Sequence, residues 1–69
     1  MKHRDLIRAL RQIARDHGLE LIEDGGGDHE KWRAGPIPTA VPRHRDINEL
    51  TAKTIIQRLE RQLAAKEDE

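Results

Sequence analysis

Apolar side chains recur every three or four positions near both ends of the chain, which is the spacing of an amphipathic helix. The first set of apolar residues is Leu6, Ile7, Leu10, Ile13 and Ala14. Gly18 follows at a place where a helix end favours a left-handed residue, so we expect a helix over residues 3–16. The second set is Ala52, Ile55, Ile56, Leu59 and Leu63, and it predicts a helix over residues 49–65 that Asp46 or Asn48 is suited to cap.

Shorter segments between the two helices have the pattern of strands. Residues 19–23 and 28–33 predict two strands, with Asp24 and the glycine run 25–27 as the break between them. Residues 37–41 predict a third strand, which tolerates Pro38 only at an edge or a bulge. The expected fold class is therefore α+β, with the order α-β-β-β-α and two helices on one face of a three-stranded antiparallel sheet.

Strand alternation separates the side chains of the second strand into two faces. His29, Lys31 and Arg33 fall on one face, and Trp32 falls on the other. A single tryptophan in a small domain is usually buried, so we expect Trp32 to face the helices. This places His29 on the open face of the sheet beside two cations.

The chain has 69 residues, which is enough for one small domain. We expect that domain to span residues 1–65 and residues 66–69 to form a charged, disordered tail. The absence of cysteine fits a reducing compartment, and no apolar run approaches the ~20 residues that cross a bilayer. These features predict a cytoplasmic protein without a membrane segment.

The net charge is zero, but the distribution of charge is uneven. Residues 1–65 hold twelve Lys and Arg against ten Asp and Glu, and nine of the thirteen basic residues are Arg. The planar guanidinium group suits phosphate and carboxylate partners. The composition therefore permits RNA binding without requiring it.

Four histidines are the side chains suited to acid–base chemistry near neutral pH. The glycine run by itself indicates a hairpin connection, and it lacks the spacing of a nucleotide-binding loop. His17, His29 and His44 lie twelve and fifteen residues apart, which matches no compact zinc pattern. We therefore expect no metal and no cofactor.

RNA carries its own nucleophile, the 2′-hydroxyl, so its cleavage needs proton transfer and stabilisation of charge at phosphate. His29 is the candidate for proton transfer. Lys31, Arg33, Arg43 and Arg45 are the candidates that hold the phosphate backbone. By spacing alone, an ordinary exposed histidine is the more frequent case.

Several motifs in order give the chain a family resemblance. The segment Gly-Gly-Asp-His-x-x-Trp at Gly26 to Trp32, the segment Val-Pro-Arg-His at Val41 to His44, and the opening Lys-x-x-Asp-Leu-Ile at Lys2 to Ile7 resemble the HicA toxins of bacterial toxin–antitoxin systems. The resemblance spans roughly residues 2–63. One departure is Asp28, where the family frequently has serine.

The resemblance implies a double-stranded-RNA-binding-domain-like fold and a metal-independent endoribonuclease, an mRNA interferase of a type II system. His29 falls on the family's catalytic histidine, Gly26 or Gly27 on the preceding glycine, and Trp32 on the aromatic residue that supports the site. The implied partners are mRNA and a HicB-like antitoxin that covers the active face. Two alternatives stay open: a non-catalytic RNA-binding or partner-binding module with the same fold, and a structural component whose basic face docks an acidic protein.

Overall fold

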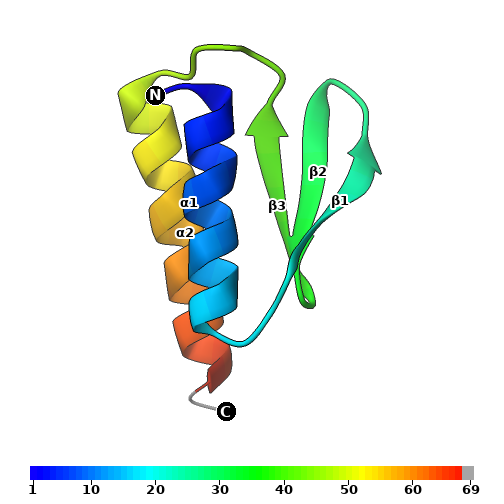
Figure 1. The fold of residues 1–69 in the computed structure, drawn as a ribbon, viewed down its shortest axis with the longest axis vertical. Helices are drawn as coiled ribbons and strands as arrows, with labels where there is room; N and C mark the ends of the chain where they lie inside the picture. Colours follow the sequence, from blue (N-terminus) through cyan, green and yellow to red (C-terminus); the bar gives the residue numbers. More distant parts are fainter. Residues whose placement is uncertain (68–69) are drawn as a thin grey trace.

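The computed structural model describes residues 1–67 and has the predicted order of elements (Figure 1). Two helices, α1 (His3–Asp16) and α2 (Glu49–Glu67), flank three strands, β1 (Leu21–Gly26), β2 (His29–Ala34) and β3 (Ile37–Pro42). The strands form one antiparallel sheet with the order β1-β2-β3. The α+β prediction is therefore confirmed.

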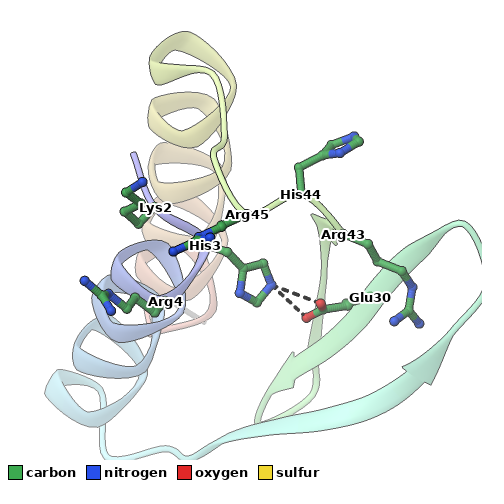
Figure 2. Close-up of a pocket in the computed structure, with 7 residues that line it drawn as sticks. All are labelled: Lys2, His3, Arg4, Glu30, Arg43, His44 and Arg45. Atoms are coloured by element: carbon green, nitrogen blue, oxygen red, sulfur yellow. Dashed lines mark hydrogen bonds and ion pairs between the residues drawn. The ribbon is translucent and has the colours of Figure 1, made fainter.

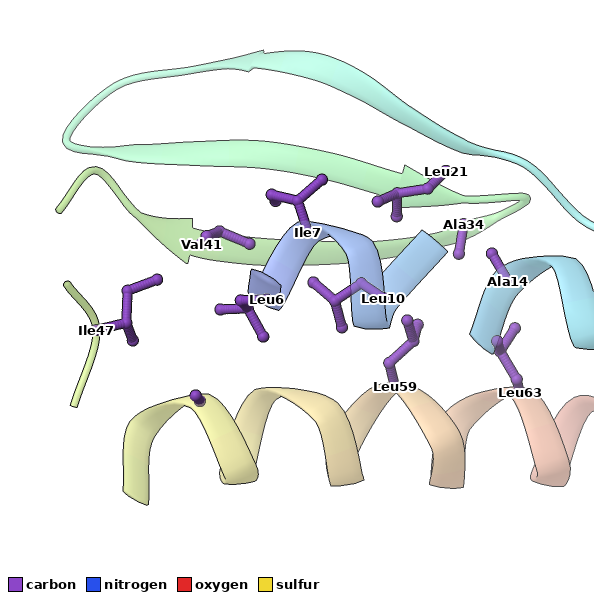
Figure 3. Close-up of a cluster of buried hydrophobic side chains, with 11 residues drawn as sticks. Leu6, Ile7, Leu10, Ala14, Leu21, Ala34, Val41, Ile47, Leu59 and Leu63 are labelled. Carbon is purple, nitrogen blue, oxygen red and sulfur yellow. The ribbon is translucent and has the colours of Figure 1, made fainter. Parts of the chain in front are cut away.

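The two helices lie side by side, run in the same direction and cover one face of the sheet (Figure 1). Apolar side chains from both helices and all three strands fill the space between the layers (Figure 3). The fully buried large side chains are Leu6, Leu10, Val41, Leu59 and Leu63. The opposite face of the sheet carries no helix, so side chains that point outward from the strands remain available to a ligand.

The alternation predicted for the second strand is confirmed. Along β2 the side chains alternate between exposed and partly or fully buried, ending with Ala34 in the core. Trp32 is partly buried and packs against the core cluster, whereas His29 is exposed. The sheet therefore has an inner face with Trp32 and an outer face with His29.

The first strand lies further along the chain than the predicted 19–23. The amide of Leu19 donates to Ala14 O (2.8 Å) and that of Gly18 to Arg15 O (2.9 Å), as in a Schellman motif at the end of α1. Leu19 is therefore used by the helix end and cannot begin the strand. At the other end β1 continues through Gly26, because a bulge between Glu23 and Gly26 lets Gly26 pair with Glu30 instead of ending the strand.

The last helix also exceeds its predicted bounds, since α2 continues through Glu67 rather than ending at residue 65. Lys66 and Glu67 therefore belong to the helix, and residues 68–69 of the predicted tail lie outside the described residues. Of the two candidate caps, Asn48 is the one that acts. Its Oδ1 accepts hydrogen bonds from the amides of Leu50 (2.9 Å) and Thr51 (3.3 Å).

A short backbone pairing joins residues 1–3 to residues 45–47. The amide of His3 donates to Arg45 O (2.8 Å), and the amide of Ile47 donates to Met1 O (2.7 Å). Lys2 and Asp46 form the bridge between them, with an ion pair of 2.7 Å from Nζ to Oδ1. This pairing holds the start of α1 beside the loop that follows β3.

Candidate nucleic-acid interface

The outer face of β2 presents His29, Lys31 and Arg33 at alternate positions, as predicted. Their neighbours on β3 are Pro42, Ala40 and Pro38 in the same order. These neighbours are two prolines and an alanine, whose short side chains do not cover the longer polar side chains of β2. Within residues 1–67, the side chains of His29 and Lys31 make no hydrogen bond or ion pair, and both residues are exposed.

Arg33 differs from its two neighbours because it has a partner. Its Nη2 lies 2.7 Å from Oδ2 of Asp24 on β1, and both side chains are about half exposed (52%). An exposed ion pair of this kind contributes at most ~1 kcal/mol, so a phosphate group is able to replace the carboxylate. Arg33 is thus a phosphate contact only in competition with Asp24.

Arg43 follows β3 and reaches back to the β1–β2 hairpin. Its Nε donates a hydrogen bond to Gly27 O (3.1 Å). A Cβ atom at Gly26 would lie 2.7 Å from Nη2 of Arg43 and 2.5 Å from the carbonyl oxygen of His29. Gly26 therefore supports the site by letting the backbone of His29 and the guanidinium group of Arg43 approach the same point.

The inner face carries a hydrogen-bonded group that centres on Glu30. Oε1 of Glu30 accepts from Nε1 of Trp32 (2.9 Å), and both carboxylate oxygens lie 3.0 Å from Nε2 of His3 at the start of α1. The side chains of Glu30 and His3 are only 14% and 26% exposed. Trp32 therefore supports the site through its indole N–H as well as through packing.

The carboxyl group of Glu30 is held in its ionised form. Burial acts to raise its pKa, but the hydrogen bonds from Trp32 and His3, with the charges of His3 and Arg43, together lower the pKa below its ordinary value. A partly buried carboxylate with three donor contacts is a rigid anchor. It fixes the imidazole ring of His3 against β2.

His3 and Glu30 line a pocket of about 360 Å³ (Figure 2). The residues that line it are Lys2, His3 and Arg4 at the start of α1, Glu30 on β2, and Arg43, His44 and Arg45 in the loop after β3. In Figure 2 the ring of His3 points toward Glu30, whereas His44 points away from that pair. Four permanent cations therefore line a hollow that contains one carboxylate.

The predicted site residues are divided between two surfaces. His29, Lys31 and Arg33 belong to the outer face, while Arg43 and Arg45 line the pocket on the helix side. The two surfaces meet where β3 ends, because His29 pairs with Pro42 and Arg43 is the next residue. A ligand that follows this edge of the sheet can touch both.

Sequence reasoning missed Lys2, His3, Arg4 and Glu30 as members of a site. A signal for Glu30 was present, since alternation places it on the same face as Trp32. A carboxylate that faces a core needs donors. The pairing that brings His3 to it lies 27 residues away along the chain and leaves no local pattern.

Comparisons with protein-family models, with curated proteins and with solved structures found no match to this chain. Among the described residues, no three His, Cys, Asp or Glu side chains come together in a way that could hold a metal ion. None of the described helices is both long and apolar enough to cross a membrane.

Proposed function

We propose that this protein is an endoribonuclease of the HicA type, an mRNA interferase, and that His29 transfers the proton during cleavage. The observation that supports the proposal is the placement of His29: it is exposed on the uncovered face of the sheet, with Lys31 and Arg33 on the same face. The fold order is also the one that the family resemblance implies. As part of the same proposal, the protein is located in the cytoplasm and its fold is of the double-stranded-RNA-binding-domain type.

The reaction uses the 2′-hydroxyl of RNA as its nucleophile. The 2′-oxygen attacks the neighbouring phosphorus, the bond to the 5′-oxygen breaks, and a 2′,3′-cyclic phosphate results. His29 accepts the proton of the 2′-hydroxyl and returns a proton to the departing 5′-oxygen. Such acid–base assistance contributes about 10²- to 10⁴-fold to the rate.

Basic side chains stabilise the charge that develops on the phosphate. Lys31 lies two residues after His29 on the same face of β2. Among residues 1–67, its side chain has no hydrogen-bond or ion-pair partner that would compete with a phosphate. Arg43, held by Gly27 O at the hairpin, lies at the edge of the sheet beside the backbone of His29. These two cations are the best placed of the four, and Arg33 and Arg45 extend the basic surface on either side.

Cleavage of total RNA by the purified protein, with EDTA present, tests the proposal. We expect cleavage by the wild type and a loss of about 100-fold or more in rate for His29→Ala. His17→Ala, at the end of α1, is the matched histidine control and should cleave at the wild-type rate. Equal rates for His29→Ala and the wild type would contradict the assignment, and cleavage that EDTA abolishes would contradict a metal-independent reaction.

The alternative is a non-catalytic module that binds RNA or a protein partner with the same face. The uncovered sheet face and its basic residues favour binding in either case. Binding that weakens steeply with salt but is never followed by cleavage would favour this alternative.

The proposed protein partner is a HicB-like antitoxin that covers the outer face. Its surface should carry carboxylates opposite Lys31 on that face, and opposite Arg43 where the face meets the end of β3. Binding to the folded state alone would raise the melting temperature of the domain, and the rise would grow with the logarithm of the partner's concentration once that exceeds Kd.

A further inference from the structure

The pocket between α1, β2 and the loop after β3 is lined by two cations, Lys2 and Arg4, that the proposed cleavage at His29 does not use, and by Arg43 and Arg45, which it does. Glu30 is the single carboxylate among the lining residues. The side chains of Arg4 and Arg45 make no hydrogen bond or ion pair to any other residue in the range 1–67. Two guanidinium groups with free donors beside a hollow are suited to an oxyanion.

The one carboxylate in the pocket is ionised, but its charge is partly offset by the donors that contact both of its oxygens. Trp32 and His3 donate to both oxygens of Glu30 from 2.9–3.0 Å. With Nε2 of His3 committed to Glu30, the other ring nitrogen, Nδ1, is the one that remains for a ligand (Figure 2). A protonated imidazole would present Nδ1–H as a further donor.

The backbone adds to the same charge. His3 is the first residue of α1, so the positive end of the helix dipole faces the region where Lys2, Arg4 and Arg45 gather. The amide of His3 itself is bound to Arg45 O (2.8 Å), which fixes the loop against the helix. The backbone that carries Arg4 and Arg45 is therefore held in place without a ligand.

We propose that this pocket binds a phosphate group of an RNA strand, other than the phosphate that faces His29. The choice of RNA rests on the proposed function, whereas the choice of phosphate rests on the pocket. A strand whose scissile phosphate lies over His29 passes Arg43 at the end of β3 and places a neighbouring phosphate between Arg45, Arg4 and Nδ1 of His3. This second contact fixes the direction of the strand across the edge of the sheet.

Binding of a fluorescent single-stranded RNA tests the proposal, in a His29→Ala background so that the probe stays intact. The oligonucleotide carries hydroxyl groups at both ends, so only internal phosphates are offered. We expect Arg4→Gln/Arg45→Gln to weaken binding about tenfold at low salt and to reduce the slope of log K against log salt by about 1. The matched control is Arg58→Gln/Arg61→Gln on exposed positions of α2, which should bind as the background does.

Nuclear magnetic resonance of the histidine side-chain nitrogens gives a second readout, with inorganic phosphate as the probe and sodium chloride at equal ionic strength as the reference. Phosphate should shift the Nδ1 signal of His3 and leave that of His17 in place. The proposal is overturned if the Arg4/Arg45 variant binds RNA with background affinity and slope, or if the His3 signal does not respond to phosphate. Cleavage that persists in His29→Ala would instead contradict the proposed catalytic role of His29. It would not contradict the proposal that the pocket binds phosphate.

Discussion

Glu30 connects more of the site than any residue that the sequence patterns single out. It lies between the indole of Trp32 and the imidazole of His3, and so it joins β2 to the start of α1. Its ionised state matters, because a charged acceptor forms stronger hydrogen bonds than a neutral one. Glu30 therefore determines how the pocket is oriented even though it contacts no ligand in the proposed reaction.

The acid side of the stability curve should report this role. The pKa of Glu30 is lower in the folded protein than its ordinary value of 4.5, so its stabilising effect is present above that value and is lost as the pH falls through the folded pKa. At pH 7 we expect Glu30→Gln to lower the free energy of unfolding by about 1–3 kcal/mol. The difference between wild type and variant should shrink from pH 5 to pH 3, as measured by urea denaturation at each pH. A difference that stays constant over this range would show that the charge of Glu30 is not the stabilising feature.

The alternation of residues along β2 predicted which side chains lie on each face. It did not predict that Glu30, on the inner face, has a role in the site. Alternation placed His29 outward and Trp32 inward because both follow from a period of two. The role of Glu30 depends on His3, which no local period connects to it. Side-chain partners from distant segments are the part of the site that sequence reasoning could not supply.

At the scale of elements, the β1–β2 hairpin positions the catalytic candidate. The bulge between Glu23 and Gly26 and the left-handed Gly25 (φ 85°) let the chain turn back into His29. Helices and strands were predictable because their apolar periods are regular. The start of β1 was not, because the capping of α1 takes up Leu19.

Gly26→Ala tests the fit of this hairpin. The added Cβ would lie 2.5 Å from the carbonyl oxygen of His29. Because this oxygen belongs to the backbone, it cannot move aside as the end of a flexible side chain can. We expect a loss of about 1–3 kcal/mol in the free energy of unfolding and slower RNA cleavage, since His29 and Arg43 would both shift.

Gly27→Ala is the control for this variant. A Cβ there meets nothing within 4 Å, and Gly27 is not among the glycines with positive φ. It should leave stability unchanged or raise it by up to about 1 kcal/mol, through the unfolded state. Equal losses for the two alanine variants would contradict the close approach at Gly26.

For the molecule as a whole, the two-layer arrangement sets both stability and access. All the large apolar residues that are fully buried lie between the helices and the sheet, so one face of the sheet is committed to the core (Figure 3). No helix within residues 1–67 covers the other face, which is the one that carries His29 and Lys31. A domain of this size has little stability to spare.

Leu10→Ala should therefore have a large effect. Leu10 is fully buried, and its truncation is expected to lower the free energy of unfolding by about 2–5 kcal/mol. Each kcal/mol corresponds to roughly 4–8 °C in a small domain, so the melting temperature should fall by about 8 °C or more. Leu50→Ala is the control: Leu50 is 72% exposed, and its change should stay within about 0.5 kcal/mol. A small shift for Leu10→Ala would mean that the core repacks around the missing atoms.

The pairing of residues 1–3 with residues 45–47 has a consequence for the order in which the protein forms. The hairpins of the sheet join neighbouring segments, whereas this pairing closes a loop of more than forty residues. On a ribosome, α1 and the β1–β2 hairpin are made before Arg45 exists. The pocket lined by Lys2, His3 and Arg45 therefore arises late in synthesis, after the chain has reached Ile47.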